Sequence, residues 1–175
     1  MELLLGIDIG SSSVKCAVVD VKTGDCLGSA FSPKTEMVIH APKQGFAEQN
    51  PNMWWNEFKH AFSELKQQLG FDKEAVVAIG ISYQMHGLVA VDKSGEPVMH
   101  SIIWCDSRAV NQGNQAFASL GEEFCLTHYL NSPGNLTASK LKWVKENQPE
   151  VYSKIFKVML PGDYIAYRLT GEMNT

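Results

Sequence analysis

The sequence predicts an α/β fold with a mixed sheet flanked by helices, and three observations support this class. Three short apolar or alternating runs open the chain at residues 3–9, 14–20 and 26–31, separated by the polar turns GSSS and KTGD. A long helical pattern with one apolar face follows them. A second apolar run and a mostly helical remainder complete the chain of 175 residues. Strands and helices that share one core define this fold class.

The first three runs predict an antiparallel meander, because short polar turns join strands that lie side by side. Residues 32–49 show no clear period and contain two prolines and a glycine, so we expect a long connection there. Within it only EMVIH, residues 36–40, suggests a short strand. Long loops in compact domains often carry function, which makes this connection a place to look for functional residues.

The strongest helix signal begins at NPNMWW. Asn50 can cap the helix, Pro51 suits its first position, and Gly70 follows its last turn. Apolar residues recur at steps of three and four and predict one stripe that covers the sheet: Trp54, Phe58, Ala61, Phe62, Leu65 and Leu69. We therefore expect these aromatic side chains to belong to the core rather than to a binding site.

The apolar run AVVAIGIS, residues 75–82, predicts a strand that is buried on both faces, as a central parallel strand would be. The segments GLVAVD and VMHSIIW then bracket a turn, KSGEP. From residue 106 the chain is mostly helical until a last strand at 155–160 and a helix at 163–169. The helical part has caps and breaks at Asp106, Gly121, Pro133 and Thr137.

Bulk composition limits the classes of function. A chain of 175 residues that is 45% hydrophobic can bury the core of one ordinary domain. Its net charge of -4 argues against nucleic acid or an anionic membrane as partner, because both attract basic patches. The longest apolar runs are too short to span a bilayer, and the first residues lack the basic start of a signal peptide. We expect a cytoplasmic protein.

Cysteine and histidine spacing gives no metal signature. The four cysteines form no CxxC pair and are expected to be free thiols: Cys16, Cys26, Cys105 and Cys125. The five histidines lack HExxH or zinc-finger spacing. We therefore expect no protein-held transition metal.

The stretch GIDIGSSSVK is the first candidate site. Asp8 ends an apolar strand, and the turn from Gly10 to Ser13 exposes backbone N–H groups and hydroxyls that can hold phosphate oxygens. A carboxylate of this kind can hold Mg²⁺ through its water shell. The chain has no GxxxxGK[ST], so this is not a P-loop. The alternative is a polar turn that merely faces solvent, with Lys15 on the wet face of its strand.

The stretch SYQMHG is the second candidate site, because it follows the predicted buried strand. Open α/β sheets bind ligands at the carboxyl ends of their strands. Gln84 and His86 offer directional hydrogen bonds, and Met85 offers an adaptable apolar wall, a mixture that suits a polyol. The alternative for His86 is a core histidine whose hydrogen bonds are satisfied internally.

A third cluster follows the next predicted strand. Trp104, Asp106 and Arg108 bring together an aromatic face, a carboxylate and a guanidinium. They could form the wall of a ligand pocket. The alternative is structural: Asp106 caps a helix and Arg108 is its partner on the surface.

Five segments resemble the FGGY carbohydrate kinases in order and spacing: GIDIGSSSVKCAVVD, AEQNPNMWW, GISYQMHGLV, IIWCDSRA and LPGDYIAYRLTGE. The resemblance covers essentially the whole chain, and QMHG is most similar to the xylulokinase branch. It implies the actin-like ATPase fold, which is also described as ribonuclease H-like. It also implies an enzyme that transfers the γ-phosphoryl group of ATP to an open-chain ketose, with D-xylulose as the favoured substrate.

The resemblance also assigns roles. It implies ATP and Mg²⁺ as cofactors, with Asp8 as the catalytic and metal-holding acid. The phosphate site would comprise Gly10, Ser11, Ser12, Ser13 and Lys15. The sugar site would comprise Gln84, Met85, His86, Trp104, Asp106 and Arg108. Tyr83 and Cys105 depart from the residue types common at these positions, which affects the expected shape of the pocket.

Members of this family continue after LTGE through a segment with the catalytic base and then a second domain. Residues 1–175 are therefore expected to be the N-terminal part of the first actin-like domain, inactive by themselves. The alternatives are a kinase for another pentulose or polyol, and a non-catalytic actin-like module that binds sugar or a partner chain. An exposed sheet edge would favour self-association, so a homodimer is a further expectation.

Overall fold

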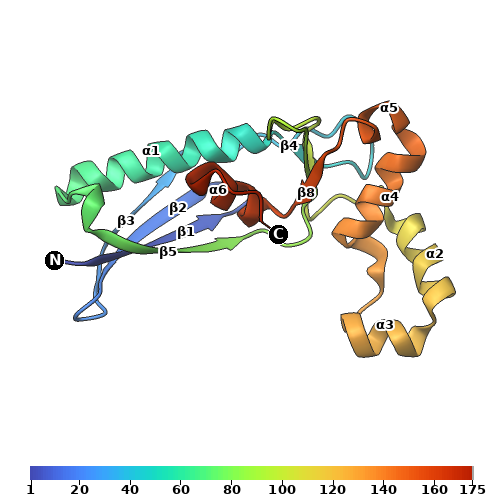
Figure 1. Ribbon diagram of the computed structural model, residues 1–175, viewed down its shortest axis with the longest axis horizontal. Helices are drawn as coiled ribbons and strands as arrows, with labels where there is room; N and C mark the ends of the chain where they lie inside the picture. Colours follow the sequence, from blue (N-terminus) through green and yellow to red (C-terminus); the bar gives the residue numbers. More distant parts are fainter. Residues whose placement is uncertain (175) are drawn as a thin grey trace.

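The structure is a computed structural model that describes residues 1–174. A four-stranded sheet forms one end of the molecule, and helices α2 to α5 gather at the other (Figure 1). The sheet has the order β3-β2-β1-β5 and consists of β1 (Leu3–Ile9), β2 (Val14–Asp20), β3 (Cys26–Ser32) and β5 (Val76–Tyr83). The first three strands are the predicted antiparallel meander, and β5 is parallel to β1.

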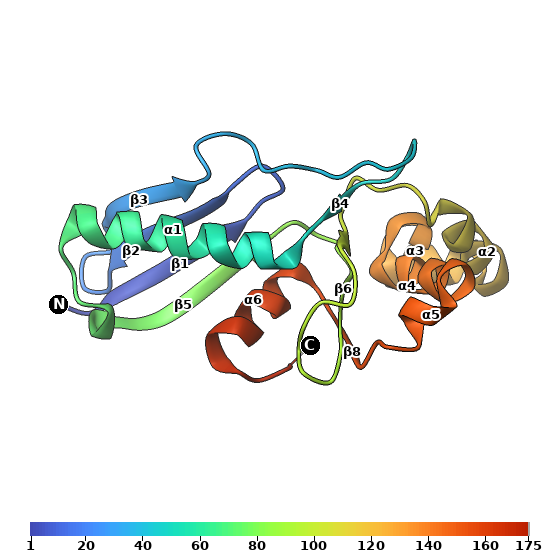
Figure 2. The ribbon, with the colours of Figure 1, turned by 90° about the horizontal axis from the view of Figure 1, so that it is seen from above.

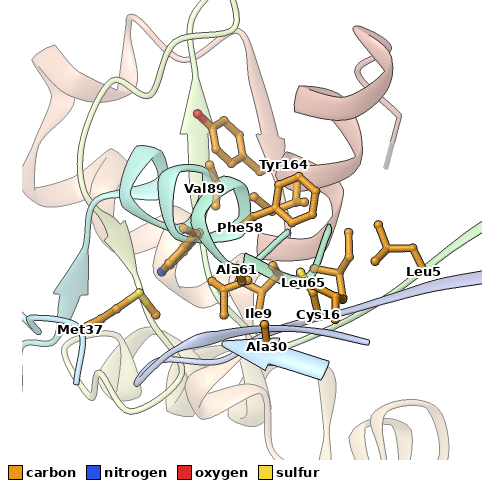
Figure 3. Packing of buried hydrophobic residues seen from close by; sticks show 14 of the residues in the cluster. Leu5, Ile9, Cys16, Ala30, Met37, Phe58, Ala61, Leu65, Val89 and Tyr164 are labelled. Atoms are coloured by element: carbon orange, nitrogen blue, oxygen red, sulfur yellow. The ribbon is translucent and has the colours of Figure 1, made fainter. Parts of the chain in front are cut away.

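Helix α1 (Pro51–Leu69) covers one face of this sheet, as the apolar stripe predicts (Figures 1 and 2). The Asn50 side chain accepts from the backbone N–H of Asn52, and Gly70 ends the helix with φ 66°. Within the core, Phe58, Ala61 and Leu65 of α1 lie above the strands (Figure 3). The strands alternate, so that every second side chain of β1 and β2 is buried under α1.

Strand β5 corrects one prediction. It is parallel to β1 as expected, but it is the edge strand of the sheet within residues 1–174. Val77 and Ile79 are 54% and 45% exposed, so burial on both faces is wrong for these residues. An apolar run indicates what a strand can bury; which neighbours cover it depends on its place in the sheet.

Short elements connect the sheet to the helical end (Figure 2). The connection predicted for 32–49 contains no strand at 36–40; a single bridge joins His40 to Glu48 instead. Two small sheets pair β4 with β7 and β6 with β8: β4 (Glu48–Gln49), β6 (Val89–Val91), β7 (Ser101–Ile102) and β8 (Lys157–Met159). The β4–β7 pair places the long connection beside the segment after β5, and the β6–β8 pair places that segment beside the strand that precedes α6.

The helices of the second half are α2 (Val110–Leu120), α3 (Glu122–Tyr129), α4 (Thr137–Asn147), α5 (Pro149–Tyr152) and α6 (Pro161–Thr170). Single 3₁₀ turns lie at Lys73–Ala75 and Pro133–Asn135. Helix α6 begins before residue 163, and the Asp163 carboxylate accepts from the N–H of Leu160. Neither predicted cap is used: α2 starts at Val110, beyond Asp106, and Thr137 is already inside α4.

The four cysteines are free, as predicted. Burial raises the pKa of Cys16 to about 12, so this thiol stays protonated and acts as a small core residue. No helix within residues 1–174 is both long enough and apolar enough to cross a membrane.

The packing of α1 predicts a large effect at Leu65, which is fully buried beneath the helix. We expect Leu65→Ala to lower the free energy of unfolding by about 2–5 kcal/mol, because a cavity replaces the side chain. Urea denaturation would measure this change. Gln67→Ala, on the exposed side of the same helix, is the control. Equal losses in the two variants would contradict the packing described.

Candidate functional site

Strand β1 places Asp8 near the carboxyl edge of the sheet, just before the turn that begins at Gly10. Asp8 lies opposite Lys15 on β2 and opposite Ser82 on β5. Its Oδ2 is 3.6 Å from Nζ of Lys15, and 45% of its side chain is exposed. Gly10 closes the turn by donating its N–H to the carbonyl of Ser13, 3.1 Å away. The carboxylate thus lies beside a polar turn that is open to solvent, as an anion or metal site requires.

The side chain of Gln49, on β4, holds this turn by a hydrogen bond. Its Nε2 donates to the carbonyl oxygen of Ser11 at 2.7 Å, and its Oε1 accepts from Nε1 of Trp54 at 3.0 Å. Nε2 of Gln84 reaches the same Oε1 at 3.4 Å. No role for Gln49 follows from its residue type alone, although it lies in AEQNPNMWW, one of the five segments that carry the family resemblance. A buried amide there joins the turn after β1 to the turn after β5.

The turn after β5 continues the sheet beyond its last paired residue. The N–H of Gln84 donates to the carbonyl of Ile9 at 2.9 Å, so the ends of β1 and β5 meet. Met85 is 64% exposed, and His86 has φ 60°, a left-handed conformation that few residues other than glycine adopt. Burial and the neighbouring Lys140 charge lower the pKa of His86. The imidazole is therefore neutral at pH 7 and can both donate and accept a hydrogen bond.

Trp104, from a third segment, contacts the turn after β1. Its Nε1 donates to Oγ of Ser11 at 3.3 Å, and the residue is 48% exposed. The Nδ2 of Asn135 holds the backbone carbonyl of Trp104 at 2.5 Å. The structure thus brings Ser11, Gln84 and Trp104 into one neighbourhood.

Asp106 and Arg108 lie inside the protein. Nε and Nη2 of Arg108 donate to the Asp106 carboxylate, Nη2 at 2.7 Å, and Nη2 also reaches Glu48 at 2.8 Å. The guanidinium stacks on Phe46 at 3.8 Å, and Asp106 Oδ2 also accepts from the N–H of Ala47 at 2.6 Å. Arg108 is the partner of Asp106, as the structural alternative predicts, but the pair is buried rather than on the surface, since the Arg108 side chain is 1% exposed. That Asp106 and Arg108 belong to the sugar site stays a prediction. Their buried contacts favour a role in fixing the shape of the loop after β7.

The donor set suits a lightly coordinated divalent ion. Among residues 1–174 no group of three or more His, Cys, Asp or Glu side chains could hold a metal ion. Magnesium, however, usually keeps several waters and takes one or two carboxylates together with substrate phosphates. Asp8 and the exposed turn beside it fit that arrangement.

An antiparallel meander with a parallel fourth strand, and polar turns at the carboxyl edge, defines an actin-like α/β domain. The model of the FGGY family of carbohydrate kinases, N-terminal domain, matches residues 3–175. The chain therefore belongs to this family, which confirms the predicted family and fold.

Individual relatives agree. The chain is 34% identical over 177 residues to a xylulose kinase of Lactococcus lactis. This match covers 100% of this chain and 34% of that protein. It is 33% identical over 171 residues to a xylulose kinase of Escherichia coli, with 97% of this chain and 34% of that protein covered. The chain thus spans about a third of the length of the curated relatives it matches.

Solved structures give the same picture. A xyloylose kinase from Brucella ovis matches with a TM-score of 0.87 and 31% identity over 98% of this chain and 35% of that one. A xylulose kinase from Rhodospirillum rubrum matches with a TM-score of 0.84 and 25% identity over 98% and 34% of the two chains. A Plasmodium falciparum glycerol kinase with ADP shares the fold alone, with a TM-score of 0.81 and 20% identity over 98% of this chain and 35% of that one.

The contacts of Gln49 predict a stability effect. Gln49→Leu should lower the free energy of unfolding by about 2–4 kcal/mol, because it leaves the Trp54 indole N–H and the Ser11 carbonyl without their partner. Urea denaturation followed by tryptophan fluorescence would measure it. Gln67→Leu, an exposed glutamine of α1, should change stability by less than about 0.5 kcal/mol. A Gln49→Leu protein as stable as this control would exclude the bridging role.

Proposed function

We propose that this chain is the N-terminal part of the first actin-like domain of an ATP-dependent sugar kinase, and that D-xylulose is the acceptor, giving D-xylulose 5-phosphate. The observation that carries the proposal is the meeting of two turns at one sheet edge, joined by the hydrogen bond from Gln84 N to Ile9 O. One turn suits phosphates and the other suits hydroxyls. Phosphoryl transfer requires those two groups side by side and in line.

The phosphate side rests on Asp8 and the turn that follows it. Bound Mg²⁺ would neutralise the triphosphate charge, and Asp8 would hold the ion through its waters. Backbone N–H groups and hydroxyls from Gly10 to Ser13 would hold phosphate oxygens. Lys15, 63% exposed, lies within 3.6 Å of Asp8 and would add positive charge at the same place.

The sugar side rests on the turn after β5. His86, neutral at pH 7, can donate to one substrate hydroxyl and accept from another. Met85 and Trp104 supply exposed apolar surface for the carbon chain, and Gln84 holds the turn to β1. Asp106 and Arg108 would act through the shape of the loop behind Trp104. The general base that accepts the hydroxyl proton would come from the rest of the kinase.

The names of the relatives favour a ketose, since the curated relatives described above are xylulose kinases. The fold also occurs in a gluconate kinase from Lactobacillus acidophilus, at a TM-score of 0.78 and 25% identity, so another polyol is the second candidate. A non-catalytic sugar-binding module is the third. Cytoplasmic location, the absence of nucleic-acid and membrane partners, and a homodimeric state remain proposals.

The phosphate assignment predicts the behaviour of Asp8→Asn in the full-length kinase. Turnover should fall by about 100-fold, because the amide keeps the shape of the carboxylate but loses the charge that holds the magnesium waters. Coupled measurement of ADP release at limiting Mg²⁺ would test this, with residues 1–175 alone as the expected inactive background. Asp25→Asn, in a turn at the far end of the sheet, is the control. Near-normal rates for Asp8→Asn would reduce Asp8 to a turn acid.

The sugar assignment predicts a selective effect at His86. His86→Ala in the full-length kinase should raise the KM for D-xylulose by roughly three- to tenfold, the value of one lost hydrogen bond, while the KM for ATP changes little. Met85→Leu, nearly equal in volume and apolar, is the matched control and should do far less. A His86→Ala kinase with normal sugar kinetics and a lower melting temperature would instead identify a core histidine.

A further inference from the structure

Lys140 is a buried lysine for which the proposed mechanism has no use. It lies on α4 and is 0% exposed. Its Nζ donates to the backbone carbonyl of His86 at 2.6 Å and to that of Ile103 at 3.0 Å. Among residues 1–174 no carboxylate lies within 4.0 Å of this ammonium group. The lysine is thus held by two carbonyls that belong to the two loops of the candidate sugar site.

Two neighbours of Lys140 reach the same loops. Oγ1 of Thr137 donates to the carbonyl of Gly87 at 3.4 Å, and Nδ2 of Asn135 donates to that of Trp104 at 2.5 Å. The segment from Asn135 to Lys140 therefore binds two adjacent carbonyls in each loop: His86 and Gly87 in one, Ile103 and Trp104 in the other. Of the three side chains Asn135, Thr137 and Lys140, it is that of Lys140 that bonds to both loops.

Packing alone does not account for a lysine here. Burying an ammonium group without a paired carboxylate is costly, and an apolar residue such as Met would fill similar space without that cost. Burial lowers the pKa of Lys140 to about 8, with the Arg108 charge acting in the same direction and Asp106 and Cys105 acting against it. The ammonium group donates hydrogen bonds to two backbone carbonyls, which an apolar side chain could not do. One of these carbonyls belongs to His86, whose left-handed backbone needs such support.

We propose that Lys140 is a positioning residue for the sugar site, and that it fixes the spacing between the turn at His86 and the loop at Trp104 by binding one backbone carbonyl of each. This inference rests on the proposed function for the identity of the ligand. Its geometric part, the clamp between the two loops, stands independently. Residues that act on a substrate must be held to within a fraction of an ångström, which explains why a costly group is retained there.

Titration provides a structural check. The groups that face Lys140 are Asp106, Cys105 and Arg108 on the loop after β7, and His86 on the turn after β5. The pKa of Lys140 is about 8 in the folded state, and its ordinary value, expected in the unfolded state, is 10.5. Between these two pH values the folded protein therefore binds fewer protons at Lys140 than the unfolded protein does. Its contribution to folding stability therefore rises as the pH rises from about 8 to 10.5. Lys140→Met should remove this rise.

The clamp is tested by amide hydrogen exchange in the full-length kinase. Lys140→Met should speed exchange in both 84–88 and 103–106 and leave β1 and β2 unchanged, because the variant removes both carbonyl bonds but nearly keeps the volume. Lys145→Met, an exposed lysine of the same helix, is the control. Exchange in both loops equal to that of the control would overturn the clamp.

Smaller variants keep the test valid if Lys140→Met fails to fold. Thr137→Val should loosen only the His86 turn, and Asn135→Ala only the Trp104 loop. If each instead left its loop unchanged, the segment would not hold these carbonyls and the proposal would fail.

Kinetics then connect the clamp to function. Lys140→Met should raise the KM for D-xylulose by about tenfold or more, with the KM for ATP within about twofold, and Lys140→Arg should recover part of the loss because it keeps donors and charge. Faster loop exchange with an unchanged KM for sugar would limit Lys140 to a structural role and overturn its positioning role. If the unmodified kinase did not act on D-xylulose, the proposed function would fail. The exchange result would still decide whether Lys140 holds the two loops together.

Discussion

The parallel pairing of β1 with β5 is the constraint on which the candidate site depends. Residues Leu4 to Ile9 pair in register with Ala78 to Tyr83, and the Gln84 N–H extends the ladder by one bond to Ile9. Parallel strands end at the same edge of a sheet. Two turns that are more than seventy residues apart in the chain therefore emerge side by side, one rich in serine and one carrying Gln84, Met85 and His86.

Buried side-chain hydrogen bonds position most of this edge. Gln49 joins the serine turn to Gln84 through its amide, and Lys140 joins the two loops of the candidate sugar site through backbone carbonyls. The buried Asp106 and Arg108 are satisfied mainly by each other and by Glu48. Buried polar groups of this kind hold loops only when their partners are present, so each bond that a variant removes has a local and measurable effect.

Several elements could be predicted from local signals alone. The short apolar or alternating runs at residues 3–9 and 14–20 predicted strands, and Asn50, Pro51 and Gly70 predicted both ends of α1. These predictions hold because the periods of strands and helices and the capping of a helix are decided within a few residues. The stretch GIDIGSSS likewise identified its own turn.

Tertiary structure decided the features that depend on distant neighbours. The run at β5 has the composition of a central strand, yet its exposure follows from its place at the edge of the sheet. The local sequence allowed Asp106 to be a helix cap with Arg108 as its partner on the surface. In the structure Phe46 and Glu48 from the long connection enclose them. Gln49 and Lys140 carry no local signal, because an amide or an ammonium becomes a clamp only when folding brings carbonyls from separate segments within hydrogen-bond distance.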